Sequence, residues 1–106
     1  MTYRMKYVIV ETFMAALPIV FSEMQQHADV AHAFARRPKD NETYKDVIIG
    51  AGFCQITVEK VETLGGQTYN RAVFVCYGES ISLNVKSRED EDSKFLNKYF
   101  GVIQEY

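Results

Sequence analysis

The stretch FCQITVEKVETLGGQTYNRAVFVCY, residues 53–77, decides the fold because it predicts a long β-hairpin. Two runs of alternating side chains flank Leu64-Gly65-Gly66, and glycine readily adopts the positive φ that tight turns require. A turn centred on Gly65 forms three apolar cross-strand pairs: Cys54 with Cys76, Ile56 with Phe74, and Val58 with Ala72. A slip by one residue would turn Glu59 or Lys60 inward, so the hydrophobic pattern predicts this register.

Further strands are expected on both sides of this hairpin. Tyr7–Val10 is apolar at every position, which is typical of a central strand covered on both faces. Pro18–Phe21 follows after a short connection, and Pro18 suits the beginning of a strand because it has no N–H to donate. Beyond the hairpin, apolar residues at 81, 83 and 85 alternate with polar ones, which predicts a half-buried strand over 80–86.

Two helices complete the expected order. The first has small apolar residues at helical spacing and begins either at the capping-box pattern Ser22–Gln25 or later, at 27–29. It must end before Pro38, which cannot continue a helix. The second is expected to begin at the cap-like Ser87–Asp90 and to bury an apolar stripe within 95–100.

These elements predict one α+β domain over residues 1–106, in the order β-β-α-β-β-β-α. A chain of this length has room for a single hydrophobic core. We expect a sheet of about five strands, antiparallel or mixed, with both helices packed on one face.

Composition narrows the class of protein. Twelve Lys and Arg against fourteen Asp and Glu give a net charge of −2, so no basic excess is present to bind nucleic acid. No apolar run reaches the roughly 20 residues of a membrane helix, so no membrane span is expected. Arg4 and Lys6 before the apolar 13–17 loosely resemble a signal peptide, but 6–10 fits a strand better. Two cysteines without a secretory signal favour a reducing cytoplasm.

The cysteines and histidines are candidates for chemistry. In the predicted register Cys54 and Cys76 are inward-facing neighbours, either as small buried side chains or as a redox or metal pair. His27 and His32 are five residues apart and so point about 140° apart on a helix, which prevents easy sharing of a metal. His27 either caps the first helix or lies at a functional surface with Asp29.

A polar strip before the last helix is the candidate binding surface. It consists of Ser80, Ser82, Asn84, Lys86, Ser87 and Arg88. A strip of this kind that leads to a helix N-terminus suits an anion or a peptide, although it would also fit a solvated sheet face. The acidic run 89–92 is explained by the helix dipole. No catalytic triad, nucleophile elbow, zinc motif or P-loop is found, so neither a cofactor nor a metal is expected.

Five short pieces of the chain resemble a family of short, functionally uncharacterised phage and prophage proteins. They are MKYVIV (5–10), PIVF (18–21), HADVA (27–31), AGFCQI (51–56) and GESISLNVKSR (78–88). The resemblance implies a phage or prophage gene expressed in the bacterial host cytoplasm, without implying an activity. Residues 1–4 precede the family outline as an extension, residues 38–46 form an insert, and Glu89 stands where the outline has proline.

We therefore expect a small phage-encoded, non-enzymatic binding protein that acts by protein–protein contact, with a host enzyme or defence component as candidate partners. An exposed strand edge would also support a homodimer. Two alternatives stay open: a small enzyme or metal-dependent module that uses Cys54, Cys76 and His27, and a minor virion component.

Overall fold

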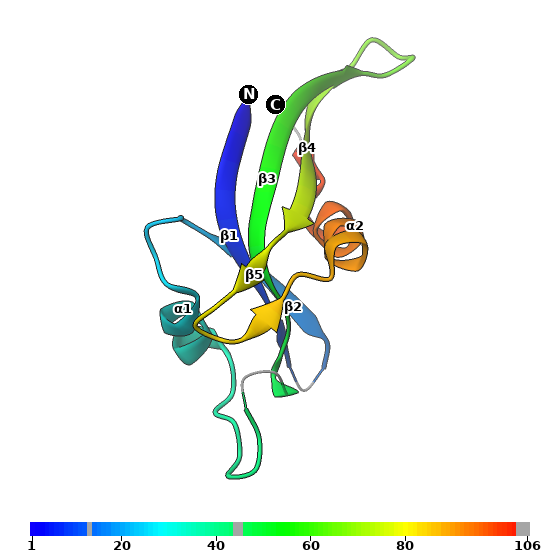
Figure 1. Ribbon diagram of the computed structural model, residues 1–106. Coiled ribbons are helices and arrows are strands. Elements are labelled where there is room, and N and C mark those ends of the chain that lie inside the picture. The colour runs from blue at the N-terminus through cyan, green and yellow to red at the C-terminus, as the bar shows by residue number, and fades with distance from the viewer. Residues whose placement is uncertain (13, 44–45, 104–106) are drawn as a thin grey trace.

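A computed structural model describes residues 1–12, 14–43 and 46–103 (Figure 1). In chain order its elements are β1 (Thr2–Glu11), β2 (Ala16–Phe21), α1 (His27–Phe34), β3 (Ile48–Glu62), β4 (Thr68–Tyr77), β5 (Glu79–Ser80), β6 (Val85–Lys86), α2 (Glu89–Phe100) and β7 (Val102–Ile103). The described residues form a five-stranded sheet in the order β2-β1-β3-β4-β7 and a two-stranded sheet of β5 and β6. All strand pairs among these residues are antiparallel, and with the two helices they form the expected α+β domain.

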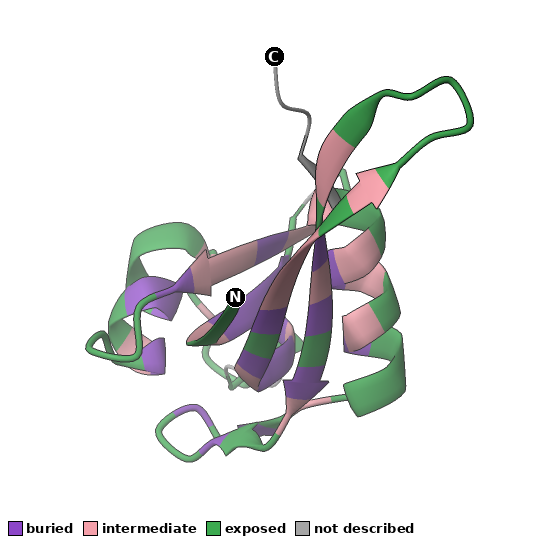
Figure 2. Cartoon of the chain, turned by 90° about the horizontal axis from the view of Figure 1, so that it is seen from above, coloured by how far each residue is buried: buried purple, intermediate pink, exposed green. Residues whose placement is uncertain are grey.

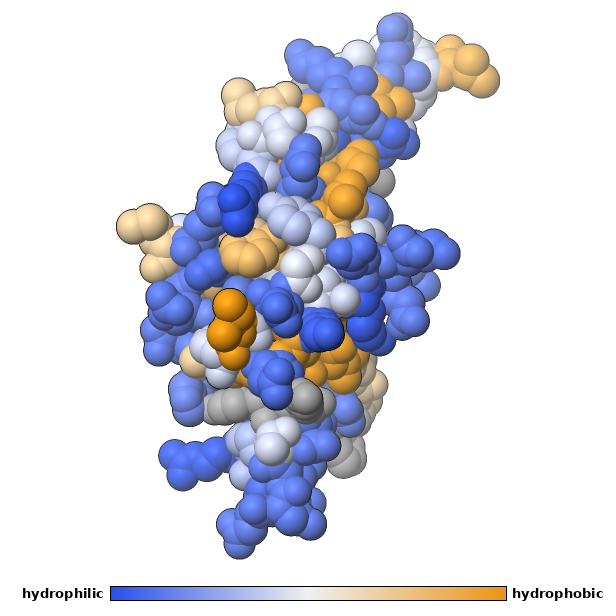
Figure 3. All heavy atoms as spheres, viewed as in Figure 1, coloured by the Kyte–Doolittle hydropathy of each residue, from blue (hydrophilic) through white to orange (hydrophobic). Residues whose placement is uncertain are grey.

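The hairpin of β3 and β4 has the predicted register. Cys54 pairs with Cys76, Ile56 with Phe74 and Val58 with Ala72. The turn is closed by a hydrogen bond from the Thr63 N–H to the Gln67 carbonyl (2.8 Å), and Gly66 has the expected positive φ of 79°. The outer half of the hairpin projects from the body as an exposed arm (Figures 1 and 2), and its surface is mainly hydrophilic (Figure 3). The molecule measures 56 × 28 × 23 Å.

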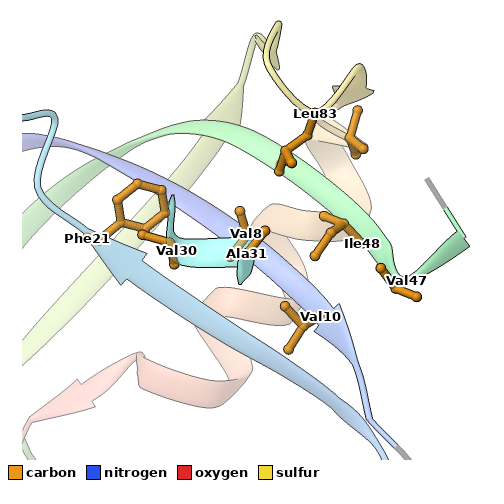
Figure 4. Close-up of a cluster of buried hydrophobic side chains, with 10 residues drawn as sticks. Val8, Val10, Phe21, Val30, Ala31, Val47, Ile48 and Leu83 are labelled. Atoms are coloured by element: carbon orange, nitrogen blue, oxygen red, sulfur yellow. The ribbon is translucent and has the colours of Figure 1, made fainter. Parts of the chain in front are cut away.

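Strand β1 lies at the centre of the packing, between β2 and β3. The four residues Tyr7–Val10 are fully buried, as their apolar run predicts. Val8 and Val10 belong to a cluster that includes Val30 and Ala31 of α1 (Figure 4). Tyr7 and Ile9 belong to a second cluster that includes Leu96 of α2. Alternate residues of β1 therefore point into two different cores on opposite sides of the sheet. We call the side covered by α1 the α1 face and the side covered by α2 the α2 face.

The expectation that both helices pack on one face is wrong. Helix α1 covers the face of Val8 and Val10, and α2 covers the face of Tyr7 and Ile9. The physical reason lies in β1, because a strand that is apolar on both sides needs a cover on both sides. Among the described residues, neither helix is long and apolar enough to cross a membrane.

The predicted strand over 80–86 is also corrected. Instead of one strand, two-residue β5 and β6 are joined by a turn at 81–84, with Asn84 at a positive φ of 55°. The Ser80 hydroxyl accepts the Leu83 N–H (3.3 Å) and so stabilises the turn. Leu83 and Val85 still reach the α1-face core, while Ile81 points to solvent.

Helix α2 lies along the outer edge of β4 and bonds to it. The Ser93 hydroxyl accepts the Cys76 N–H, the Asn97 side chain bonds both main-chain groups of Phe74, and the Gly101 carbonyl accepts the Ala72 N–H. Four helical residues advance about 6 Å and two strand residues about 6.6 Å, so the two repeats match. The helix thereby satisfies a strand edge that would otherwise be open.

Candidate functional site

The six residues of the predicted polar strip lie on the β5–β6 hairpin and on the link from β6 to α2. Ser80 is almost fully buried and serves the turn, so it is not available to a ligand. Ser82, Asn84, Lys86 and Arg88 are exposed, and Ser87 is half-buried. The strip is thus a set of exposed side chains on a short hairpin rather than a solvated face of the main sheet.

Three of these residues line an open depression of about 470 Å³. Asn84, Lys86 and Arg88 form its polar part, and Ile48, Ile49 and Val85 form its apolar part. No hydrogen bond or ion pair within the described part of the chain engages the ammonium group of Lys86. The depression therefore combines an apolar wall, an uncommitted cation and an amide, which is a combination typical of sites that recognise peptides or small polar ligands.

A buried polar network holds the floor of this region in place. Asp92 in the first turn of α2 is fully buried. Its Oδ2 accepts the Tyr7 hydroxyl (2.6 Å) and the Arg88 main-chain N–H (3.0 Å), and its Oδ1 accepts the Arg88 guanidinium (2.8 Å). Asp92 thus holds the main-chain N–H of the N-cap residue Arg88, whereas Ser87, which the sequence had suggested as the cap, bonds to Tyr7.

Tyr7 links this network to the centre of the sheet. Its single hydroxyl proton goes to the carboxylate of Asp92, because a carboxylate cannot donate, and the Ser87 hydroxyl 2.6 Å away donates to the Tyr7 oxygen. Burial raises the pKa of Tyr7 well above its ordinary value, so the hydroxyl remains a donor at every physiological pH. Gly50 leaves the space for the carboxylate, because a Cβ there would lie 2.3 Å from Asp92 Oδ2.

The network decides what the N-terminus of α2 can bind. The main-chain N–H of the N-cap residue Arg88 is bonded to Asp92, and Glu91 takes another guanidinium donor of Arg88 (3.0 Å). The first turn of α2 also carries four acidic residues, 89–92, so repulsion between like charges disfavours an external anion at this helix terminus. What remains open is the depression beside it, with Lys86 as its available charge.

The two cysteines and His27 do not form a common site. Cys54 and Cys76 are buried in the α2-face cluster, whereas His27 packs edge-on against Phe21 and Phe53 on the α1 face. Burial raises the pKa of Cys54 to about 12 and that of Cys76 to about 11, so both thiols stay protonated near neutral pH. The sheet separates them from the imidazole. Among the described residues, no group of three His, Cys, Asp or Glu side chains could hold a metal ion.

His27 is the first residue of α1 and is nearly fully buried. Its Nε2–H donates to the Gly52 carbonyl (2.8 Å) instead of capping a helix amide. Burial lowers the pKa of His27, which keeps the ring neutral. Asp29 points to solvent while His27 points to the sheet, so the predicted surface pair does not form.

Sequence reasoning missed Tyr7 and Asp92, and it missed the apolar wall of the depression. Asp92 was hidden in the acidic run, where all four residues suit the helix dipole equally well. The i, i+4 spacing of Arg88 and Asp92 and the glycine at 50 were the available signals. The chain matches no protein-family model, no curated protein and no solved structure.

Proposed function

We propose that the chain is a small phage- or prophage-encoded protein that acts in the bacterial host cytoplasm by binding another protein rather than by catalysis. The depression beside the β5–β6 hairpin is the observation that supports this proposal best. It presents an apolar wall and the ammonium group of Lys86 on a short hairpin, and the buried network of Asp92 holds the end of that hairpin in place. Protein and peptide recognition needs such a combination of apolar contact and oriented polar groups.

The rigidity of the surrounding structure favours binding without reorganisation. Leu83 and Val85 are anchored in the α1-face core, on either side of the exposed Asn84. The Ser87 N–H donates to the Gly78 carbonyl (3.0 Å), which ties the two ends of the hairpin together. A hairpin backbone that is already held in place loses less conformational entropy on binding.

The proposal is tested by site-specific crosslinking in infected cells. A photo-crosslinking amino acid in place of Lys86 should give one defined protein adduct, and the same residue in place of Lys94 should not. Lys94 is a matched control because it is an exposed lysine on α2 that does not line the depression. The Lys86→Glu variant should capture several-fold less of that protein, while Lys94→Glu captures the normal amount. Equal adducts at both positions would reject the depression as the binding surface.

The alternative of an enzyme that uses Cys54 and Cys76 makes a different demand. It requires thiols that react in the folded protein, although both are buried with raised pKa values. Native thiol titration at pH 8 should therefore be slow until the protein is unfolded with denaturant. Rapid stoichiometric modification of the native protein would favour the enzyme. Mass spectrometry of purified phage particles tests the further alternative of a minor virion component.

A further inference from the structure

Strand β1 is longer than its outer neighbour β2. The pairing of β1 with β2 runs from Glu11 opposite Ala16 to Lys6 opposite Phe21 and stops there. Residues Thr2–Met5 pair with β3 on one side only. In Figure 1 the N-terminal half of β1 extends beyond the point where the chain leaves β2, and no strand lies on its side away from β3. Among the residues that the structure describes, no strand pairs with the outer side of this segment, which is a free edge four residues long.

The main-chain groups at this edge point outward. The Val58 N–H donates to the Met1 carbonyl (2.9 Å), which makes Met1 and Val58 a hydrogen-bonded pair. Antiparallel pairs alternate between bonded and non-bonded, so Tyr3 and Met5 bond to β3 while Thr2 and Arg4 direct their N–H and C=O groups the other way. The same alternation continues into the pairing of β1 with β2, where Lys6 faces Phe21. Thr2 and Arg4 therefore offer two donors and two acceptors in line with the end of β2.

An apolar groove lies beside this edge on the α2 face. Its volume is about 340 Å³, and its lining includes Tyr3, Val20, Ile56, Val58, Phe74 and Phe100. Tyr3 belongs to the free segment of β1, and Val20 is the next-to-last residue of β2. The groove thus begins where β2 ends and where β1 has no outer partner.

We propose that the free edge of Thr2–Met5 binds an extended peptide of another protein, which adds a strand to the sheet in line with β2 and places apolar side chains in the groove. The residue opposite Tyr3 in such a strand lies on the α2 face, over the groove, because side chains alternate between faces. Peptides recognised in this way gain affinity from main-chain bonds and specificity from alternate side-chain pockets.

The added strand continues a pairing that the protein already makes. Its bonds to Thr2 and Arg4 extend the ladder of β1 with β2 by the same alternation. The other two long edges do not offer this. Helix α2 bonds to the edge of β4, and β2 carries Pro18 in its middle, where a proline withholds one main-chain donor.

Charge favours an acidic residue in the peptide. The residue opposite Arg4 would lie on the α1 face beside the guanidinium, as Glu59 lies beside Arg71 in the same sheet. The contact of Arg4 Nε with Glu23 Oε2 (3.4 Å) leaves other guanidinium donors available to that residue. The preferred ligand is thus an extended segment with an acidic residue flanked by apolar ones.

A second copy of this chain fits the edge less well. Four strand residues span only about 13 Å, so a symmetric pairing of two such edges would fall well short of the roughly 800 Å² per partner of a stable interface. An extended peptide does not need that area, because its main chain bonds to the edge while its side chains contact the groove on one face and Arg4 on the other.

The test uses a blocked heptapeptide that alternates valine and glutamate, added to isotope-labelled full-length protein and followed by NMR. Saturable shifts should be confined to the amides of Thr2–Met5 and to the groove residues, and the Arg4 amide should gain protection from hydrogen exchange. A peptide with N-methyl groups on the residues that bond the edge should bind at least about tenfold more weakly, because its main-chain bonds to the edge are lost and the methyl groups clash.

Two variants at one position separate the main chain from the side chain. Arg4→Pro removes the outward N–H without removing a bond to β3, whereas Arg4→Ala keeps that N–H. Both variants lose the contacts of the guanidinium with Glu23 and Phe53, so their melting temperatures should agree. We expect Arg4→Ala to weaken the peptide about two- to threefold, in line with an exposed ion pair, and Arg4→Pro to weaken it at least about tenfold.

Several outcomes would overturn the proposal. They are an absence of saturable binding at millimolar peptide, equal affinity of the Arg4→Pro and Arg4→Ala variants, and shifts centred elsewhere. A dimer that forms with Arg4→Ala but not with Arg4→Pro in sedimentation would assign the edge to a second copy instead. Lys86→Glu should leave peptide affinity unchanged, so this site and the depression of the proposed function succeed or fail separately.

Discussion

The two helices are held on the same sheet by different kinds of interaction. Helix α2 is fixed by directional bonds: buried Asp92 joins it to β1, and Ser93 and Asn97 join it to β4. Helix α1 presents two buried apolar residues, Val30 and Ala31, and the side chain of His27 bonds it to the Gly52 carbonyl in the sheet. Hydrogen bonds specify one position, whereas apolar packing only requires that a surface be covered.

This difference explains where the exposed functional candidates lie. The β5–β6 hairpin enters α2 directly, so the network of Asp92 and Arg88 holds the depression as well as the helix. The free edge of β1 lies at the opposite end of the strand from its pairing with β2. Substitutions that break the contacts of α2 should therefore lower the free energy of unfolding more than a substitution at the contact of α1 with the sheet.

The largest effect is expected from Asp92→Ala. This change leaves the buried Tyr7 hydroxyl and the partly exposed Arg88 guanidinium without their acceptor. Each buried polar group that loses its partner costs about 1–3 kcal/mol, and the cavity left by the carboxylate adds to that loss. Urea unfolding measures the loss. Asp90→Ala, an exposed carboxylate in the same helical turn, should change the free energy of unfolding by less than about 0.5 kcal/mol. Similar losses for the two variants would show that the buried network is not what fixes α2.

Gly50→Ala attacks the same network from the sheet. The new methyl group would lie 2.3 Å from Asp92 Oδ2, so either the carboxylate or the helix must move. Overpacking of this kind costs about 1–3 kcal/mol. The matched control is Gly65→Ala in the hairpin turn, where the nearest atom is 3.9 Å from the new Cβ. Denaturant midpoints of the two variants measure the difference, and equal midpoints would contradict the close approach of Asp92 to Gly50.

Asn97→Ala tests the contact between α2 and the edge of β4. It leaves the N–H and C=O of Phe74 without their side-chain partner, although water reaches this part-buried edge, so we expect a loss of about 1–2 kcal/mol. Hydrogen exchange should become faster at the Phe74 amide and remain unchanged at the Thr57 amide. Unchanged protection of Phe74 would mean that the edge does not depend on the helix.

The buried His27 on the α1 face predicts that the free energy of unfolding depends on pH. Burial lowers its pKa in the folded protein, so the unfolded chain takes up the proton first as the pH falls through its ordinary value of 6.5. The contribution of the neutral ring to stability is therefore complete above that pH and is lost below it. Free energies of unfolding at pH 8 and pH 5.5 should differ less in His27→Gln than in the parent. An equal difference in the two proteins would contradict a buried neutral ring at this position.

Several elements could be predicted because they depend on local periodicity. The pairing of Cys54 with Cys76 followed from alternating side chains and a glycine turn, and the burial of Tyr7–Val10 followed from an unbroken apolar run. The strand over 80–86 failed because alternation over a few residues does not distinguish a strand from a turn whose apolar side chains both reach the core. The candidate site was predicted at Asn84, Lys86 and Arg88, but not at Ile48 and Ile49, which are distant in the chain.

By itself the sequence determined the cores of the four long strands of the main sheet, the hairpin register and the α+β class, because these depend on side-chain periods of two and 3.6 residues that can be counted along the chain. Only the tertiary structure decided that the helices lie on opposite faces, that Asp92 is the buried member of its acidic run, and that β1 extends beyond β2 beside an apolar groove. Each of these depends on which residues meet across the sheet, and no local pattern contains that information.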